Sequence, residues 1–188
     1  GLRVSFVGLA PYAWAGPLNN IPVAQALVRK AVAVSDLVVV MIHAGAEGSD
    51  QGHVPRGTET AFGENRGDSR KLAHALIRSG ADLVVGSGPH VIRGMEWYQG
   101  KLIAYSTGNF AGWHNFGLGG TLSESALLQV RLSNSGKTLS AKWVPVWIEE
   151  PGRPIVDARE RSLVHANQLS RSDFGQHAAL IHSDWSVR

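Results

Sequence analysis

The sequence predicts an α/β fold, and three observations support this prediction. Short apolar strands alternate with helical patterns in the first half, the second half changes to strands joined by tight turns, and the composition is that of a globular domain. The chain has 188 residues, of which 44% are hydrophobic and 18% charged, and it has no cysteine. This length fits one domain, or one domain with an appendage, and the composition excludes a disordered tail and a disulfide scaffold.

The first elements along the chain alternate strand and helix. Arg3 to Leu9 is predicted to be a buried strand. Asn20 can cap a helix that has Pro22 in its first turn, where a missing N–H costs nothing, and apolar residues then recur at helical spacing. Leu37 to Ile42 is a continuous apolar run that ends at His43, and such runs are typical of central parallel strands covered on both faces.

A long polar segment and a second helix–strand unit follow. Ala44 to Gly67 is rich in glycine and polar residues and is predicted to be one long loop, a kind of segment that is usually functional or disordered. Asp68 can cap the next helix, which Gly80 terminates. Leu83 to Val85 is then a second short buried strand.

Beyond this point the pattern indicates antiparallel strands. Met95 to Tyr98 and Leu102 to Tyr105 flank a tight turn, and Ala126 to Leu132 and Thr138 to Trp147 flank another, so we expect two hairpins. The segment between the hairpins, Ala111 to Gly120, is rich in glycine and aromatic residues and is predicted to be a loop.

The end of the chain is weakly patterned. We divide the chain into a main part, residues 1–148, and a C-terminal tail, residues 149–188, with one short terminal helix expected around Ser172–Phe174 and Ala178–Ile181. The basic residues are spread evenly and form no run, so the sequence predicts no nucleic-acid or anionic-membrane contact. The longest apolar stretch is interrupted by Ser35 and Asp36 and is shorter than the ~20 residues of a membrane helix.

Histidines follow two predicted strands of the α/β half. His43 ends one strand, His90 comes shortly after the next, and Glu47 lies in the loop behind His43. Ligand sites in open α/β sheets lie beyond the carboxyl ends of the strands, and neutral imidazole there is suited to a divalent metal. From spacing alone, a hydrogen-bonded structural role is the more common one for such histidines.

Other polar residues lie near glycine-rich turns. Ser87 is part of Gly86-Ser87-Gly88, which favours a sharp turn, and Ser106 and Asn109 lie at a bend after a strand. His114 lies in the aromatic loop, where a substrate contact and no role are equally compatible with the pattern. The sequence lacks a nucleophile elbow around Ser87, a phosphate-binding Gly-Lys-Ser/Thr and a His-Glu-x-x-His zinc motif.

Taken together and in order, these segments resemble a known family. The segments are His43-Ala44-Gly45-Ala46-Glu47, the run from Gly80 to Gly86, Gly88-Pro89-His90-Val91, the hairpin from Gly94 to Lys101, Tyr105-Ser106-Thr107-Gly108-Asn109-Phe110, and the ending from Leu169 to Gly175. They resemble the CapA family of poly-γ-glutamate capsule biosynthesis, within the calcineurin-like metallophosphoesterase superfamily. The resemblance covers nearly the whole chain.

The resemblance implies a metallophosphoesterase-like αββα sandwich, of which this chain is the C-terminal half plus a tail. It implies a divalent metal ion (Mn, Zn, Fe, Mg or Ca) bound by His43 and His90, with Glu47 and His90 in catalytic roles. Ser87, Ser106, Asn109 and His114 would shape the site or contact substrate. The chain departs from the family in two ways: Gly88 stands where many members carry a further histidine, and the N-terminal half, which would supply Asp, Asn and His ligands, is absent.

Two functions from different classes follow from the resemblance. The first is a metal-dependent hydrolase that acts on a phosphoester or a γ-glutamyl amide. The second is a non-catalytic accessory subunit, or a module that binds an anionic polymer through Trp113, His114, Asn115 and Phe116. The expected partners are the N-terminal half of the domain, membrane components of a capsule synthase and the polymer itself, at the cell envelope or the extracellular face of a bacterial membrane.

Overall fold

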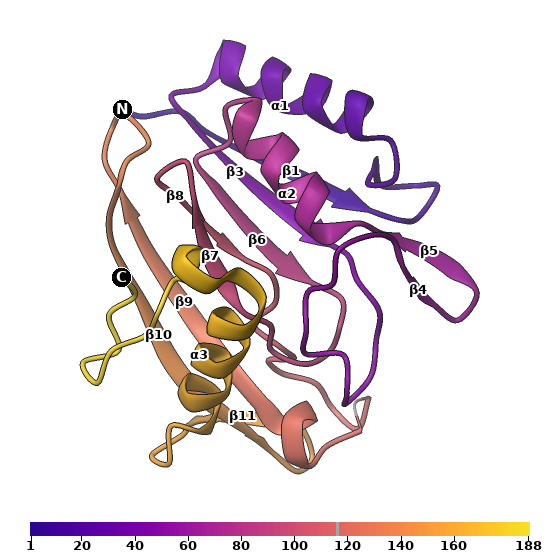
Figure 1. Ribbon diagram of the computed structural model, residues 1–188, viewed down its shortest axis with the longest axis vertical. Coiled ribbons are helices and arrows are strands. Elements are labelled where there is room, and N and C mark those ends of the chain that lie inside the picture. The colour runs from indigo at the N-terminus through magenta and orange to yellow at the C-terminus, as the bar shows by residue number, and fades with distance from the viewer. Residues whose placement is uncertain (116) are drawn as a thin grey trace.

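The protein is described by a computed structural model that covers residues 1–115 and 117–188. Two sheets and three α-helices make up its main layers (Figure 1). The larger sheet has the order β2-β1-β3-β6-β8-β7, the smaller has the order β11-β10-β9, and β4 and β5 form a separate hairpin. The strands are β1 (Val4–Ala10), β2 (Gly16–Pro17), β3 (Leu37–His43), β4 (Glu59–Ala61), β5 (Glu64–Gly67), β6 (Leu83–Ser87), β7 (Met95–Tyr98), β8 (Lys101–Ala104), β9 (Glu124–Leu132), β10 (Thr138–Glu149) and β11 (Arg153–Val156). The helices are α1 (Ile21–Val34), α2 (Ser69–Arg78), α3 (Arg161–Phe174) and the 3₁₀ turns η1 (Gly120–Ser123) and η2 (Gly175–His177).

The large sheet is parallel except for its edge strand β7, which pairs antiparallel with β8. Helices α1 and α2 cover one face of it (Figure 1). Each helix begins at the expected cap: the Asn20 side chain accepts from the backbone N–H of Val23, and Asp68 accepts from that of Lys71. These caps confirm the predicted helix starts and, with them, the α/β prediction for the first half.

The small antiparallel sheet and α3 pack over the opposite face of β6, β8 and β7, where they form a second core. Trp143 of β10 is fully buried there, together with Leu102 of β8 and Met95 of β7, and Leu169 of α3 joins them. The two predicted hairpins are therefore confirmed, with β9 and β10 slightly longer than expected. Because α3 contributes to this core, the tail is packed against the main part of the chain.

The predicted terminal helix is wrong in its position. Helix α3 begins at Arg161 and ends at Phe174, and Ala178 to Ile181 are extended. The backbone N–H of Ala179 donates to the carbonyl of Met95, so this segment bonds to the edge of the large sheet. The apolar run reflects burial beside β7, where Ala179 and Ile181 are buried, and not a helical face.

The prediction of an unbroken loop from Ala44 to Gly67 is also wrong. The segment contains the hairpin β4–β5, which projects beyond the large sheet (Figure 1). The turn of this hairpin places Phe62 in the left-handed region at φ 52° and Gly63 at φ 77°. The two strands are short and polar, so no alternation of apolar residues marks them in the sequence.

The second face of the large sheet is covered only in part. On β1 the side chain of Phe6 is 71% exposed, and its neighbours on the same face, Val4 and Met41, are also exposed. In the part of the chain that the structure describes, no helix is long and apolar enough to cross a membrane.

Candidate functional site

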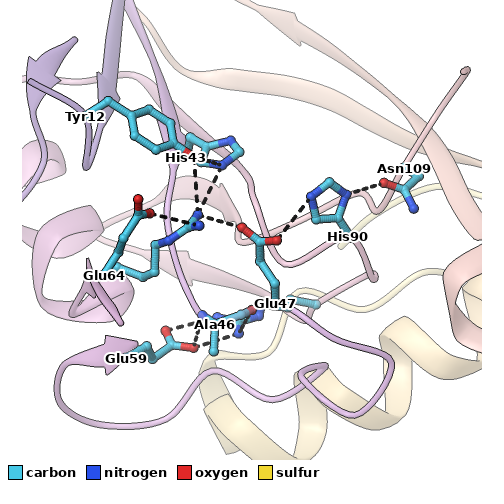
Figure 2. A network of polar contacts seen from close by, with 10 residues as sticks. Tyr12, His43, Ala46, Glu47, Glu59, Glu64, His90 and Asn109 are labelled. Carbon is cyan, nitrogen blue, oxygen red and sulfur yellow. Dashed lines mark hydrogen bonds and ion pairs between the residues drawn. The ribbon is translucent and has the colours of Figure 1, made fainter. Parts of the chain in front are cut away.

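Four parallel strands of the large sheet deliver polar side chains to one edge. Tyr12 follows β1, His43 ends β3, His90 follows β6 and Asn109 follows β8. Because the carboxyl ends of parallel strands share one edge, these residues converge although they are far apart in the sequence (Figure 2). The expectation that His43 and His90 share this edge agrees with the observed arrangement.

His90 is held in a strained and directed conformation. Its backbone is in the left-handed region at φ 63°, which is uncommon for a residue with a side chain. Its Nδ1 lies 2.7 Å from Oδ1 of Asn109, whose amide nitrogen donates to the carbonyl of Leu122. We therefore assign the Nδ1–H tautomer, which leaves Nε2 facing Glu47, whose Oε2 is 3.6 Å away (Figure 2).

Glu47 links His90 to a buried arginine. Its Oε1 is 2.7 Å from Nη1 of Arg66, a side chain that is 4% exposed, and its Oε2 is the atom that faces His90. The other terminal nitrogen of Arg66, Nη2, pairs with Oε2 of Glu64 at 3.1 Å. The Nε of Arg66 is buried and has no hydrogen-bond partner among the described residues. Arg66 is thus a buried cation with two carboxylates and one unused donor.

His43 lies on the other side of Arg66. Its Nε2 faces the Tyr12 hydroxyl (Figure 2), at a distance of 3.3 Å. The same nitrogen is 3.5 Å from Nη1 of Arg66. Burial lowers the pKa of His43, and the positive charge of Arg66 lowers this pKa further, against an opposing effect of Glu47. His43 is therefore a neutral imidazole that accepts at Nε2.

A cavity of about 270 Å³ opens beside this cluster. It is lined by Glu47, His90 and Asn109, by Phe62 from the β4–β5 turn and by Leu122 and its neighbours from the glycine-rich loop. At its wall the carboxylate of Glu47 faces the imidazole of His90, so both groups of this pair are accessible from the cavity. It is the place where a small part of a substrate can reach His90.

A larger cavity, of about 450 Å³, lies between α2 and the end of α3, and we assign the polar groups at its wall a structural role. It is lined in part by His74 and Glu96. Burial raises the pKa of Glu96, but hydrogen bonds of 2.6 Å from His74 and from the Tyr105 hydroxyl outweigh that effect and hold this pKa below its usual value. Because these groups bond to one another, we place the candidate site at His90 instead.

Three further residues expected at the site lie at its margin or away from it. Ser87 ends β6 and its hydroxyl donates to the carbonyl of Ile42. Ser106 is buried, and its hydroxyl accepts from the backbone N–H of Gly108, so it shapes the turn that presents Asn109. His114 is exposed and its ring lies edge-on to Trp113, while Phe116 of the same loop lies outside the described residues.

Sequence reasoning missed Arg66 and Tyr12. Arg66 belongs to β5, in a segment predicted to be loop, and nothing in its local sequence distinguishes a buried arginine from a solvated one. Tyr12 follows a strand in the same way as His43 does, so the rule that located the histidines also applies to Tyr12.

The residues present do not fit a divalent metal by themselves. The guanidinium of Arg66 lies against both Glu47 and Nε2 of His43, so a cation already occupies the space between these donors. Among the described residues, no group of three or more histidine, aspartate or glutamate side chains is arranged to hold an ion. At Gly88, φ is 118°, which side chains rarely adopt, and a Cβ would lie 3.0 Å from the carbonyl oxygen of Ala44, so a histidine at this position would be strained.

Comparison with known proteins places the chain in a family. Residues 11–112 match the family described as "Bacterial capsule synthesis protein PGA_cap". The chain is 35% identical over 141 residues to "Capsule biosynthesis protein CapA" of Bacillus anthracis, which covers 73% of this chain and 29% of that protein. It is 35% identical over 112 residues to "PGA biosynthesis protein CapA" of Bacillus subtilis (strain 168), which covers 58% of this chain and 25% of that protein.

The aligned region is therefore less than a third of either relative's length. Among solved structures, a hypothetical protein from Thermus thermophilus overlaps 83% of this chain and 56% of that chain, at 18% identity and a TM-score of 0.40, a likeness too low to inform function. The family match covers more than half of the chain, with the His43 and His90 segments and Asn109 inside it. The chain therefore belongs to the PGA_cap family of CapA-like bacterial capsule synthesis proteins.

Proposed function

We propose that this chain carries a histidine–glutamate acid–base site that hydrolyses γ-glutamyl amide bonds in poly-γ-glutamate, the polymer that the family resemblance implies. One observation carries the proposal: Asn109 fixes Nδ1 of His90 at 2.7 Å, while Nε2 faces Glu47 at the wall of a cavity of about 270 Å³. A base held in one tautomer, beside a carboxylate and open to substrate, is the arrangement that proton transfer needs.

The chemistry assigns a task to each of these residues. Nε2 of His90 takes a proton from a water molecule whose oxygen attacks the amide carbonyl carbon, and the Glu47 carboxylate stabilises the imidazolium that forms. The carbon–nitrogen bond then breaks, and the same proton passes from His90 to the leaving amine. Asn109 keeps the ring in place by accepting from Nδ1–H throughout. The carboxylic acid that forms then gives its proton to the free amine, so the products are a carboxylate and an ammonium group, and one water is consumed for each bond broken.

No step of this proposal passes through a metal ion. Arg66 already supplies a positive charge between Glu47 and His43, and a divalent ion at this place would meet that charge. A metal site that includes His43 and His90 remains a proposal that needs ligands from outside this chain.

The expected partners are also proposals. We infer that the N-terminal half of the domain covers the exposed face of β1 and β3, because Val4, Phe6 and Met41 present apolar side chains there and both relatives are much longer than this chain. Association with membrane components of a capsule synthase, and a location at the cell envelope, rest on the family resemblance alone.

A second candidate function is favoured by one observation. Trp113 is exposed and stands beside His114, which is a suitable surface for binding a polymer without cleaving it. In that case the chain would be an accessory or polymer-binding module, and Trp113→Ala would weaken polymer binding.

The test is an assay of new amine ends released from a defined γ-glutamate oligomer. We expect His90→Ala and Glu47→Gln each to lower the rate by about 10²- to 10⁴-fold, since both remove the proton-transfer pair. His182→Ala is the matched control, because His182 is exposed and does not line the His90 cavity, and it should retain the wild-type rate. A rate unchanged in His90→Ala, or oligomer binding without release of amine, would contradict hydrolysis, and the latter outcome favours the binding module. A phosphodiester tested in parallel should not be cleaved.

A further inference from the structure

The ion pair between Glu64 and Arg66 joins an exposed group to a buried one. Arg66 is 4% exposed, whereas the side chain of Glu64 is 50% exposed. Both residues lie on β5, and the β4–β5 turn just before Glu64 carries Phe62 to the wall of the His90 cavity. Glu64 is therefore the more exposed of the two glutamates that pair with Arg66, the cation that also contacts His43.

The two glutamates that hold Arg66 differ in how firmly they are placed. Glu47 is 15% exposed and contacts both Arg66 and His90, so it belongs to the interior of the cluster. Glu64 makes its ion pair with Nη2 of Arg66 at 3.1 Å from a hairpin of two short strands. Partly solvated pairs of this kind are weak, because water competes for both charges. Glu64 is thus the partner that a ligand can replace at small cost.

Arg66 also has donor capacity that the chain leaves unused. Its Nε is buried and has no hydrogen-bond partner among the described residues, although an arginine can donate five hydrogen bonds in one plane. A buried donor without a partner is costly, so a ligand oxygen that reaches it gains a strong charge-assisted bond.

We propose that Glu64 is an internal stand-in for a carboxylate of the ligand, and that the ligand's carboxylate replaces it on Arg66 when the polymer binds. The ligand class is a chain of glutamyl units, whose free carboxylates have the same chemistry as the Glu64 side chain. This inference takes the identity of the polymer from the proposed function. It adds Arg66 as the group that recognises the polymer and Glu64 as an internal competitor that lowers the affinity for the polymer.

The experiment measures binding of a short γ-glutamate oligomer by isothermal titration calorimetry, without reference to turnover. Glu64→Gln removes the competing charge and keeps the shape of the side chain, so its affinity should exceed that of the wild type by about three- to tenfold. Glu149→Gln is the matched control, because Glu149 pairs with Arg153 at 2.7 Å on an exposed surface and its substitution changes the net charge equally. The control should bind as the wild type does.

Arg66→Gln should lose oligomer binding in both the wild-type and the Glu64→Gln background. Because a change at a buried arginine can weaken the fold, the decisive comparison is that between Glu64→Gln and Glu149→Gln, both of which change exposed groups. An unchanged or weaker affinity in Glu64→Gln, an equal gain in Glu149→Gln, or no binding by either would overturn the inference. Tighter binding by Glu64→Gln without release of amine would support this inference and contradict the proposed hydrolysis. Release of amine with unchanged affinity in Glu64→Gln would support hydrolysis and contradict this inference.

Discussion

Two buried arginine–glutamate pairs flank the segment that follows β3, and they differ in how completely their charges are matched. Arg93 and Glu59 form one pair, with side chains that are 1% and 4% exposed. Arg66 forms the other, with Glu47 inside the cluster and Glu64 outside it. The two arginines are almost equally buried, so burial alone does not separate a structural charge from a functional one.

The Arg93 pair is closed. Nη1 and Nη2 of Arg93 bond both oxygens of Glu59, Nε donates to the carbonyl of Gln51, and Nη2 also reaches the carbonyl of Ala46. Glu59 in turn accepts from the backbone N–H of Ala46 and from the hydroxyl of Ser69. Every nitrogen of this guanidinium has an acceptor, and the pair fastens the loop after β3 to the β4–β5 hairpin and to α2.

We call the Arg66 pair open, because its guanidinium lacks a complete set of acceptors among the described residues. Its Nε has no partner in the described part of the chain, one of its glutamates is half exposed, and two of its neighbours are the polar residues Tyr12 and His43. The unmatched donor and the exposed partner are the two features on which we base the proposed ligand contact at Arg66. In this chain Arg93 has an acceptor for every nitrogen, whereas Arg66 keeps one donor without an acceptor among the described residues.

The largest expected effect concerns the closed pair. Arg93→Met leaves the Glu59 carboxylate buried without its partner, and we expect it to lower the free energy of unfolding by about 3–5 kcal/mol, measured by urea denaturation. Arg66→Met should cost less than half as much, because one of the two carboxylates that it releases, Glu64, is half exposed and can reach water. Equal losses in the two variants would contradict the distinction between the pairs.

The second expected effect concerns the hydrogen bond between Asn109 and His90. Asn109→Ala removes the acceptor that fixes Nδ1 of His90, so the rate of amine release should fall by about tenfold, with most of the change in kcat. Nitrogen NMR of the His90 ring provides the readout that a loss of stability alone would not produce. In the wild type, the neutral imidazole of His90 should carry its proton on Nδ1. In the variant, the population should shift toward the Nε2–H tautomer. A wild-type ring protonated on Nε2 would refute the assigned tautomer.

A smaller effect concerns pH. Burial and Arg66 hold the pKa of His43 below its usual value of 6.5, so the unfolded chain binds a proton at His43 before the folded chain does. The contribution of His43 to stability is therefore complete above pH 6.5 and is lost as the pH falls from 6.5 through the lowered pKa. His43→Gln should flatten the dependence of the urea midpoint on pH in this window. A stability that rises as the pH falls below 6.5, and that His43→Gln abolishes, would contradict the sign.

The smallest expected effect concerns an exposed ion pair, which serves as a reference for the two buried ones. The pair between Glu149 and Arg153 lies on the surface, with side chains that are 40% and 71% exposed, and Arg153→Gln should change the free energy of unfolding by less than about 1 kcal/mol. Urea denaturation in low and high salt checks this expectation. If Arg153→Gln lowered the free energy of unfolding as much as Arg93→Met does, burial would not determine how strongly these ion pairs stabilise the fold.

Much of the fold was predictable, because it depends on local patterns. Helix caps at Asn20 and Asp68, the apolar run of β3 and the turns of the hairpins all carry their signal within a few residues. The position of α3 was not predictable in this way. The extended segment around Ala179 is held by pairing with β7, which is distant in sequence, and its apolar residues imitate a helix in isolation.

The site was predictable only where it follows the sheet. His43, His90 and Asn109 each come after a parallel strand, so the rule for strand ends brings them together. Arg66 reaches the site from a hairpin that the sequence does not reveal, and its burial comes from contacts with Glu47 and Tyr12. Sequence reasoning therefore located the imidazoles but not the guanidinium that lies against Glu47 and His43.

One spectrum tests the distinction between the two arginines most directly. The Nε–H resonances of Arg66 and Arg93 can be followed by proton–nitrogen NMR during titration with a short γ-glutamate oligomer, and each is assigned by its loss on substitution. We expect a saturable shift at Arg66, whose Nε has no partner among the described residues, and none at Arg93, whose Nε donates to the carbonyl of Gln51 at 2.9 Å. An unchanged Arg66 resonance at saturating oligomer, or equal shifts at both arginines, would contradict this expectation.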